Sequence, residues 1–209
     1  MKKTFALFAI IFAICAFIAP VNAARSDAPQ AFVEGLSKNA IATLTEKDIT
    51  PAERDHRFRV LLNQNFDVPS IGRFALGRYW RSANTEQQQE YLRLFESVIV
   101  ATYSARFSKY SGQRIEATDT QSEVDSILVR SKMINPDGSE PVMIDWRLKP
   151  NGSGYKITDL IVEGVSMSIT QRSEYSSVIE RSGGDFNALL AVLRKKASGQ
   201  QQASVKSND

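Results

Sequence analysis

The stretch VDSILVRSKMINPDGSEPVMIDWRLKPNGSGYKITDLIVEG, residues 124–164, decides the fold class. It holds three segments rich in Val and Ile, which favour β-strands, and the turn sequences NPDG at 135–138 and NGSG at 151–154 separate them. A fourth segment of the same character, RIEATDT at 114–120, precedes them. Across 142–149 apolar and polar residues alternate, so one face of that strand is apolar and the other solvated. We therefore expect an antiparallel meander of four strands.

Helical patterns lie on both sides of the predicted sheet. In each pattern the apolar residues recur at the 3.6-residue period of an amphipathic helix. Because helices and strands occupy separate parts of the chain, and no internal repeat or interdomain linker is found, we expect one α+β domain with the helices on one face of the sheet. The predicted helices cover 27–44, 51–65, a short segment after Asp67, 85–110, 165–182 and 186–196.

Three helix starts carry recognisable capping residues. The sequences TPAE at 50–53 and TEQQ at 85–88 fit the capping box, with Thr50 and Thr85 as the capping residues. Asp67 is placed to cap the short helix that follows it. Gly77 is predicted just beyond the end of that helix, where a left-handed conformation is favourable only for glycine.

The two ends of the chain are predicted to lie outside the domain. Residues 1–23 combine two early lysines, an apolar run and a small-residue cleavage pattern, which indicates a signal peptide cut after Ala23 or Ala24 and a periplasmic protein. An uncleaved membrane anchor is the alternative, although the run is short for a span. The single domain then covers 24–196, and the polar, low-complexity tail 197–209 is expected to be disordered.

The composition excludes several classes of function. The only cysteine, Cys15, lies inside the predicted signal peptide, so the mature chain has no disulfide and no thiol nucleophile. Of the 26 Lys and Arg residues, Lys2 and Lys3 leave with the signal peptide, and the remaining 24 nearly balance 23 acidic residues. This balance gives no electrostatic argument for nucleic-acid binding.

Few residues in the chain could support catalysis. His56 is the only histidine, and neither a G-x-S-x-G nor an H-E-x-x-H sequence is present. The sequence therefore predicts no catalytic residue, no metal site and no cofactor.

The stretch IGRFALGRYWRS at 71–82 comes within one residue of a phosphate-binding loop. A nucleotide-binding function is not supported, because Arg78 stands where that loop has lysine and Tyr79 stands where it has serine or threonine. The three arginines of the stretch are predicted as headgroup or partner contacts beside two aromatic rings. They are Arg73, Arg78 and Arg81.

Two long segments, 66–112 and 162–196, strongly resemble the MlaC, or toluene-tolerance, family of periplasmic phospholipid carriers. The shared residues are Phe66, Asp67, Ile71, Leu76, Gly77 and Trp80 in the first segment and Gly164, Val165, Ser166, Arg172, Gly183 and Leu190 in the second. The resemblance implies helices packed on an antiparallel sheet around an apolar pocket for acyl chains. It also implies a shuttle, expected to be a monomer, that approaches membranes transiently. Such a shuttle carries phospholipid between an outer-membrane lipoprotein complex and an inner-membrane ABC transporter complex.

Three other functions stay open at this point. Some relatives occur with hopanoid-synthesis enzymes, so the cargo is a hopanoid or another lipid in one alternative. A second alternative is an adaptor that binds transporter proteins and carries nothing. The third is a small α+β hydrolase or isomerase that uses His56 as a base inside its pocket.

The wall of the expected pocket is assigned to the apolar face of the sheet and the facing stripe of the longest helix. Each of these residues has ordinary core packing as its alternative, because a core and a lipid pocket are both apolar. The candidates are Phe95, Val98, Ile99, Tyr103 and Phe107 on the helix and Ile127, Val129, Val142, Ile144, Trp146 and Leu148 on the sheet.

Overall fold

The computed structural model describes the backbone of residues 28–206 and the side chains of residues 28–198. The predicted signal peptide and its cut after Ala23 or Ala24 lie outside the described residues. The helices are α2 (Ala28–Leu44), α3 (Pro51–Asn65), α4 (Val68–Leu76), α5 (Tyr79–Ser82), α6 (Thr85–Tyr103), the 3-10 helix η1 (Ser104–Lys109), α7 (Met167–Arg181) and α8 (Phe186–Lys206). The strands are β1 (Arg114–Ser122), β2 (Ile127–Ile134), β3 (Val142–Asn151), β4 (Gly154–Val162) and β5 (Val165–Ser166).

The sheet is the predicted antiparallel meander, extended by one strand. Its order is β1-β2-β3-β4-β5, and each neighbouring pair is antiparallel. The prediction of four strands is corrected to five, because the chain reverses at Glu163 and Gly164 and pairs two more residues with β4. Both turn residues have positive φ, 50° and 76°. Glutamate rarely adopts such a φ, so the sequence carried no turn signal there.

The helix starts agree with the capping prediction at Thr50 and Asp67 and differ by one residue at the third site. Thr50 caps α3 by accepting a hydrogen bond from the backbone amide three residues on, at 3.1 Å. For α6 the capping residue is Asn84 and not Thr85, and its partner in the reciprocal box is Gln87. The predicted box, 85–88, and the observed box, 84–87, overlap in sequence, and asparagine is a slightly better capping residue than threonine. Gln88 is not part of the capping box, and its side-chain amide donates instead to the backbone carbonyls of Trp80 and Ala83, which precede α6.

Two helix ends differ from their predicted positions. The longest helix was expected to reach about Tyr110, but α6 ends at Tyr103 and continues as the tighter helix η1. The buried Ser104 marks this change, and its hydroxyl donates to Asp55 of α3. At the other end of the chain, the backbone of α8 is helical to Lys206, within the segment predicted to be disordered. This correction has a physical reason, because Ala, Gln and Lys in that segment are good helix formers.

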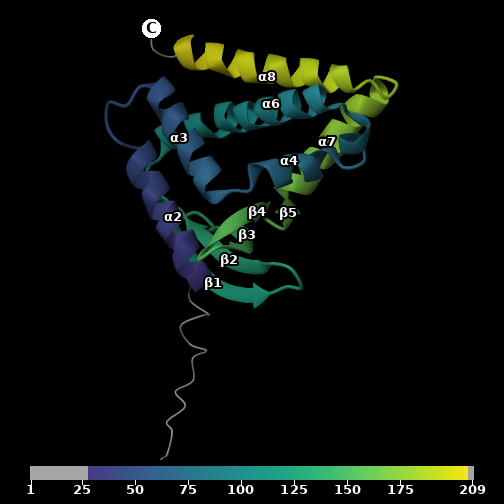
Figure 1. Ribbon diagram of the computed structural model, residues 1–209. Coiled ribbons are helices and arrows are strands. Elements are labelled where there is room, and N and C mark those ends of the chain that lie inside the picture. Colours follow the sequence, from purple (N-terminus) through teal and green to yellow (C-terminus); the bar gives the residue numbers. More distant parts are fainter. Residues whose placement is uncertain (1–27, 207–209) are drawn as a thin grey trace, which may run out of the picture.

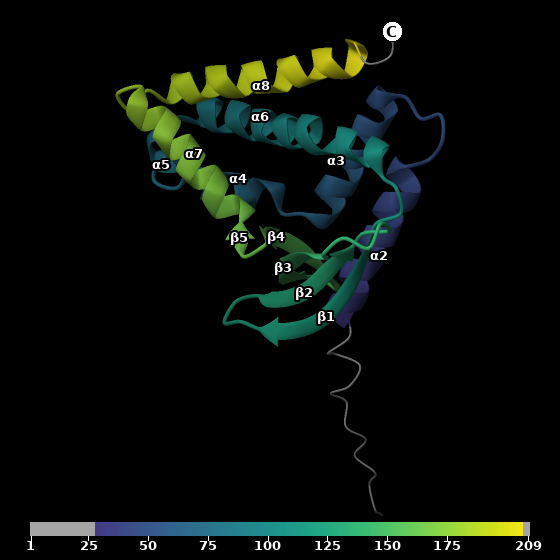
Figure 2. The same ribbon diagram turned by 180° about the vertical axis from the view of Figure 1, so that it is seen from behind.

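The helices and the sheet form separate layers. In Figure 1, α8 lies at the top along α6, with α3, α4 and α7 below them and the sheet at the bottom. Helix α2 runs down one side and packs on β1 and β2, which lie nearest the viewer in Figure 2. The α+β class and the placement of helices against the sheet are therefore as predicted.

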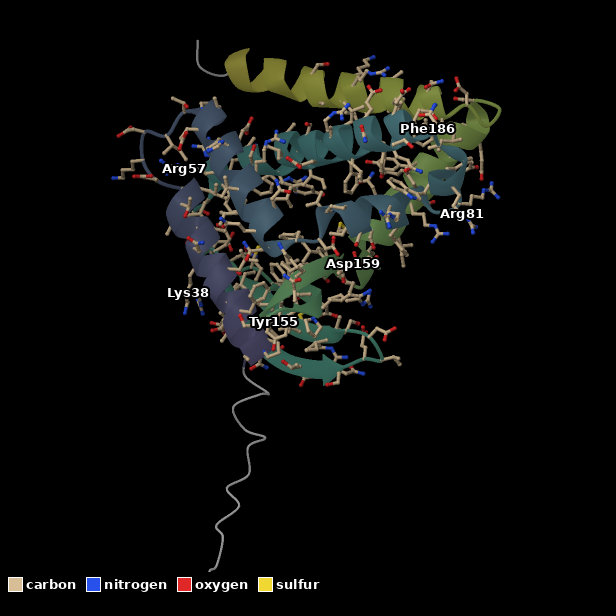
Figure 3. The ribbon with its side chains drawn as sticks, viewed as in Figure 1. Lys38, Arg57, Arg81, Tyr155, Asp159 and Phe186 are labelled. Atoms are coloured by element: carbon tan, nitrogen blue, oxygen red, sulfur yellow. The ribbon has the colours of Figure 1, made fainter. Side chains whose placement is uncertain are left out.

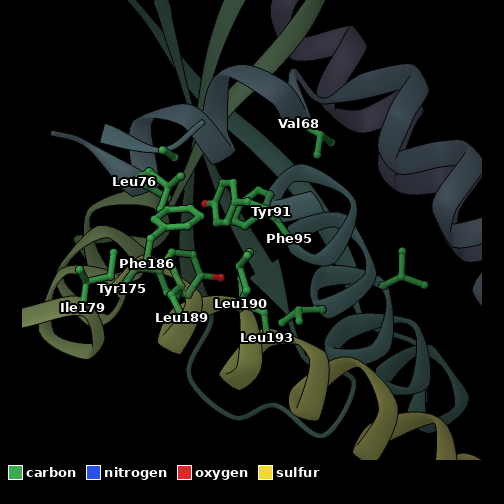
Figure 4. Packing of buried hydrophobic residues seen from close by; sticks show 14 of the residues in the cluster. Val68, Leu76, Tyr91, Phe95, Tyr175, Ile179, Phe186, Leu189, Leu190 and Leu193 are labelled. Atoms are coloured by element: carbon green, nitrogen blue, oxygen red, sulfur yellow. The ribbon is translucent and has the colours of Figure 1, made fainter. Parts of the chain in front are cut away.

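The helical layer has its own core, built around aromatic rings. Tyr91 and Phe95 of α6 stack, and Tyr175 of α7 and Phe186 of α8 meet Tyr91 edge-on (Figure 4). The Tyr91 hydroxyl is buried and donates to the carbonyl of Gly72 at 2.9 Å. Burial raises the pKa of Tyr91, so the phenol stays neutral.

A second core lies between the sheet and α2. Its buried residues are Val33, Val129, Trp146, Leu148 and Ile157. The indole Nε1 of Trp146 donates to the buried Ser131 hydroxyl at 2.9 Å, which satisfies both polar groups.

Polar contacts attach α7 to the sheet. Asp159 of β4 is buried, and it accepts from the Ser166 hydroxyl at 2.6 Å and from the Ser168 amide at 3.0 Å (Figure 3). Arg147 lies 3.4 Å from Asp159 and also bonds Glu123, and this bond lowers the pKa of Glu123. The first turn of α7 is therefore fixed to β4 by a buried carboxylate that is also paired with Arg147.

Candidate functional site

An apolar cavity of about 510 Å³ lies between the two cores, and it is partly open to solvent. Helices α2 and α3 form one wall, η1 and the residues after it form a second, and the inner face of the sheet forms the third. The lining residues are Leu36, Ser37, Ala40, Ile41, Leu44, Phe58, Leu61, Leu62, Phe66, Tyr103, Arg106, Phe107, Lys109, Tyr110, Gln113, Arg114, Ile115, Met133, Ile144, Trp146 and Leu160. Its volume falls within the range of about 300–1,000 Å³ that small-molecule sites occupy.

The cavity wall on α2 follows from helical periodicity. Leu36, Ala40, Ile41 and Leu44 are spaced by four, one and three residues, so they share one face of the helix. The same face begins one turn earlier with Val33, which packs in the sheet core. The N-terminal part of α2 therefore packs on the sheet, and its C-terminal part lines the cavity.

Two arginines of α3 hold the cavity end of α2. Arg54 donates to the carbonyl of Leu44 at 3.0 Å, and Arg57 donates to the carbonyl of Thr43 at 3.2 Å. These carbonyls belong to the last turn of α2, which has no further helical partner for them. Arg57 also pairs with Glu53 and with a second glutamate in the loop before α3. These contacts join the C-terminal end of α2 to α3 beside the cavity, and Figure 3 labels Arg57 among them.

Four of the residues predicted for the pocket wall line this cavity. They are Tyr103 and Phe107 from the end of the longest helical segment, and Ile144 and Trp146 from β3. Ile144 and Trp146 are two residues apart on β3, so their side chains lie on the same face of the sheet.

The other seven predicted wall residues do not line this cavity, although two of them, Val98 and Ile99, line a second hollow described below. Phe95 and Val98 are buried in the helical core, and Ile99 packs against it. Val129 and Leu148 are buried in the sheet core, Ile127 packs against that core, and Val142 is half-buried at the start of β3. Most of the α6 stripe faces α4, α7 and α8, and only the end of α6 reaches the cavity. On the sheet, Val129 and Leu148 lie in the core that Val33 of α2 covers.

The sequence prediction also missed most of the wall. It assigned no role to the apolar residues of α2 and α3, although it recognised their helical spacing. That spacing was the available signal. The choice between packing on another helix and facing a cavity depends on tertiary contacts that the spacing does not contain.

The charged residues of the cavity wall are all cationic. Arg106 and Lys109 lie on η1, and Arg114 opens β1. All three are exposed, so they stand at the rim. The Arg106 guanidinium lies 5.0 Å from the ring centre of Tyr103, and Arg114 pairs with Glu116 at 2.7 Å. The cavity is therefore apolar inside and positively charged at its edge.

The predicted contact arginines Arg73, Arg78 and Arg81 lie elsewhere. None of them lines the cavity, and Figure 3 shows Arg81 at the opposite end of the molecule from Arg57. Arg73 stacks on Trp80 with 4.9 Å to the ring centre, and Arg78 pairs with a glutamate of α7 at 2.8 Å. A headgroup role at this cavity is not supported for these residues, and a partner role stays a prediction.

The 71–82 stretch contains the end of helix α4. Asp67 caps α4 by accepting from the Ser70 amide at 3.2 Å, and Gly77 ends the helix with φ of 54°. A Cβ atom at Gly77 would lie 2.8 Å from Nε of Arg172, which packs over the ring of Phe74. The stretch is thus a helix end packed on α7, as the glycine position predicted.

A second hollow, of about 740 Å³, lies between α6, α7 and α8. Although it is larger, its wall includes Gln171, Glu174, Lys195 and Lys196. Covering these charged and polar groups with an acyl chain would cost free energy, so this hollow is a poorer lipid site than the apolar cavity, even though Val98, Ile99 and Val192 also line it.

The remaining chemistry in the described residues is limited. His56 is exposed on α3 and does not line the cavity. Among residues 28–198, no group of three or more His, Cys, Asp or Glu side chains could hold a metal ion. In the described part of the chain, no helix has both the length and the apolar character needed to cross a membrane.

Known proteins are similar to this chain in sequence and in architecture. The family model described as MlaC protein matches residues 34–195. A Haemophilus influenzae protein named intermembrane phospholipid transport system binding protein MlaC is 23% identical over 208 residues, which cover 95% of this chain and 94% of that protein. The solved structure of a Ralstonia solanacearum phospholipid-binding protein, in complex with a phospholipid, superposes with a TM-score of 0.71 at 25% identity. That comparison covers 82% of this chain and 98% of the other.

Proposed function

The chain belongs to the MlaC protein family, and on that premise we propose that it is a phospholipid carrier whose cavity takes up acyl chains. The observation that carries the proposal is the cavity of about 510 Å³, whose interior is formed by aliphatic and aromatic side chains from every wall. The Haemophilus influenzae relative is named for phospholipid transport, and the Ralstonia solanacearum structure contains a phospholipid. Both names support a phospholipid as the ligand of this chain.

The physical task of such a carrier sets what its cavity must provide. Removing an acyl chain of about 16 carbons from water is worth about 12 kcal/mol, at about 0.8 kcal/mol per methylene. The bilayer provides the same gain, so a protein that accepts the lipid must offer an environment nearly as apolar. The cavity meets this requirement with Leu, Ile, Phe and Trp side chains. It needs no reactive group, since the covalent structure of the lipid does not change.

The finer part of the proposal concerns direction and partners. We propose that the carrier works in the periplasm, docks transiently, and exchanges lipid between an outer-membrane lipoprotein complex and an inner-membrane ABC transporter complex. The word intermembrane in the relative's name supports this role. Arg73, Arg78 and Arg81 remain candidate contacts for such partners, because they are exposed and none of them lines the cavity.

The alternative functions now differ in their support. A hydrolase or isomerase that uses His56 as a base inside the pocket is not favoured, because His56 is exposed and outside the cavity wall. A carrier of hopanoid uses the same apolar walls and differs only in cargo. An adaptor that carries nothing would leave a cavity of this size without a role.

Lipid mass spectrometry of the purified protein tests the proposal. We expect an organic-solvent extract to contain phospholipid in a fixed ratio to protein, and we expect lipid-stripped protein to reload from phospholipid vesicles. A hopanoid in the extract would move the proposal to that cargo. An extract without lipid, together with no uptake from vesicles, would refute the carrier function.

A further inference from the structure

The positive rim of the cavity has one origin in the chain. Arg106, Lys109 and Arg114 come from a segment of nine residues, 106–114, that joins α6 to the sheet. The cavity wall contains no Asp or Glu side chain among the described residues. The charged side chains of the wall are thus all cationic and all exposed, and no acidic side chain lines the wall beside them.

The partners of these cations leave donors available. Arg106 lies over the Tyr103 ring, a contact that uses the face of the guanidinium and leaves its N–H groups at the edge. Neither Arg106 nor Lys109 forms an ion pair within residues 28–198. Arg114 has one ion-pair partner, Glu116, but both side chains are at least half exposed, so this pair is weak.

A simpler explanation accounts for only part of the rim. Arg106 and Lys109 lie in the last turn of η1, where cations interact favourably with the negative end of the helix dipole. Arg114 lies on β1, beyond the helix, and gains nothing from that dipole. All three cations line the cavity, but only two of them lie at the helix end, so the helix dipole does not explain the whole rim.

The chemistry of a bound lipid connects the rim to the interior. When acyl chains occupy the apolar space, the polar end of the lipid lies at the edge of the cavity. A phosphate diester carries one negative charge and two unesterified oxygens, which match the paired donors of arginine. A neutral lipid such as a diacylglycerol presents only a hydroxyl group to the same side chains.

We propose that Arg106, Lys109 and Arg114 form a phosphate site at the mouth of the cavity, and that this site selects phosphate-bearing lipids over neutral lipids with the same acyl chains. The inference rests on the proposed lipid-binding function and adds the residues that choose the cargo. The same chemistry would attract free phosphate, but the lipid is favoured because its chains hold the phosphate at the rim.

A competition between two lipids tests the site. Lipid-stripped protein is incubated with phosphatidylcholine vesicles that contain small, equal amounts of phosphatidylglycerol and diacylglycerol with identical acyl chains. Protein-bound lipid is then quantified by mass spectrometry. We expect at least about a tenfold preference for phosphatidylglycerol over diacylglycerol, the factor that one charge-assisted hydrogen bond provides. This preference should fall in about 1 M salt, where the Debye length is about 3 Å.

A charge-matched pair of variants assigns the effect to the rim. The triple variant Arg106→Gln, Lys109→Gln and Arg114→Gln should bring the ratio of the two lipids close to one. The control carries Gln at Arg93, Lys132 and Arg181, which are exposed and line neither hollow. It removes the same three charges and should keep the wild-type ratio.

The outcomes separate this inference from the proposed function. If wild-type protein takes up no lipid, the carrier function fails. If it takes up both lipids without preference at low salt, or if the rim variant keeps the preference, the phosphate site is refuted while the carrier function stands. Inorganic phosphate is added alone, at an ionic strength matched with sodium chloride. If it lowers the preference far more strongly than chloride does, free phosphate competes with the lipid phosphate for the rim, which supports the phosphate site; if it acts no more strongly than chloride, the rim holds phosphate only when the acyl chains are bound. The wild-type salt and competition results decide the question even if the triple variant does not fold.

Discussion

Filling the cavity from α2 should separate lipid binding from folding. Ala40 lines the cavity, and its side chain is the smallest in the wall. Ala40→Trp places an indole ring in the space assigned to an acyl chain, without removing any hydrogen bond of the native structure. We expect weaker lipid uptake and, in the lipid-free protein, higher stability.

The size of each effect follows from the volume that the ring occupies. If the indole displaces about four methylenes of the acyl chain, at about 0.8 kcal/mol each, the loss is about 3 kcal/mol, or roughly 200-fold in affinity. That is about a quarter of the gain estimated for one whole chain. In the empty protein the ring replaces a void, and cavity-filling substitutions of this kind add about 1 kcal/mol of stability.

The assay uses uptake of a fluorescent phospholipid from vesicles, with urea unfolding of the lipid-free protein as the measure of stability. Ala42→Trp is the control, because Ala42 is exposed on the same helix and does not line the cavity. If Ala40→Trp takes up lipid as well as wild type, the acyl chain does not lie beside α2 and the assignment is wrong. Equal losses in both variants would show that a tryptophan anywhere on α2 interferes, which also refutes the reasoning.

Three further substitutions test the packing around the site. Gly77→Ala should cost about 1–3 kcal/mol in urea unfolding, because φ is 54° and the new Cβ would meet Arg172; a cost below about 0.5 kcal/mol would contradict this. Trp146→Phe should cost about 1–3 kcal/mol, because it leaves the buried Ser131 hydroxyl without its indole donor, and a neutral result would show that water replaces that donor. Glu123 has a lowered pKa, so its carboxylate stabilises the fold above about pH 4.3 and this contribution is lost as the pH falls through the folded-state pKa. Glu123→Gln should therefore lower the free energy of unfolding at neutral pH but not in strong acid, and equal losses at both pH values would contradict the assignment.

Much of the fold could be predicted from the sequence because its patterns are local. The alternation in β3 comes directly from the two-residue period of a strand, and the turns around it carry Gly and Asn. The capping residues of α3 and α4 were identified for the same reason. Strand β5 was missed because it has only two residues and follows a glutamate at positive φ.

The site was harder to predict because its wall is assembled by tertiary packing. Phe95 and Phe107 belong to one apolar pattern, yet Phe95 is in the helical core and Phe107 faces the cavity. The pattern reports only that both side chains avoid water. Arg106 and Arg114 were likewise visible as the end of a helix and the start of a strand, and only the folded chain brings them to one cavity edge.

The existence of two cores also bears on how the chain folds. The helical core joins α4 and α6 to α7 and α8, and the whole sheet lies between these pairs in sequence. For the helical core, the sheet is a long loop whose closure costs conformational entropy. The meander pairs only neighbouring strands, so it can form from local contacts. Once formed, it brings α7 back beside α4, with Asp159 holding the returning helix. The layer that forms one wall of the cavity thus also connects the two halves of the helical core and sets where they meet.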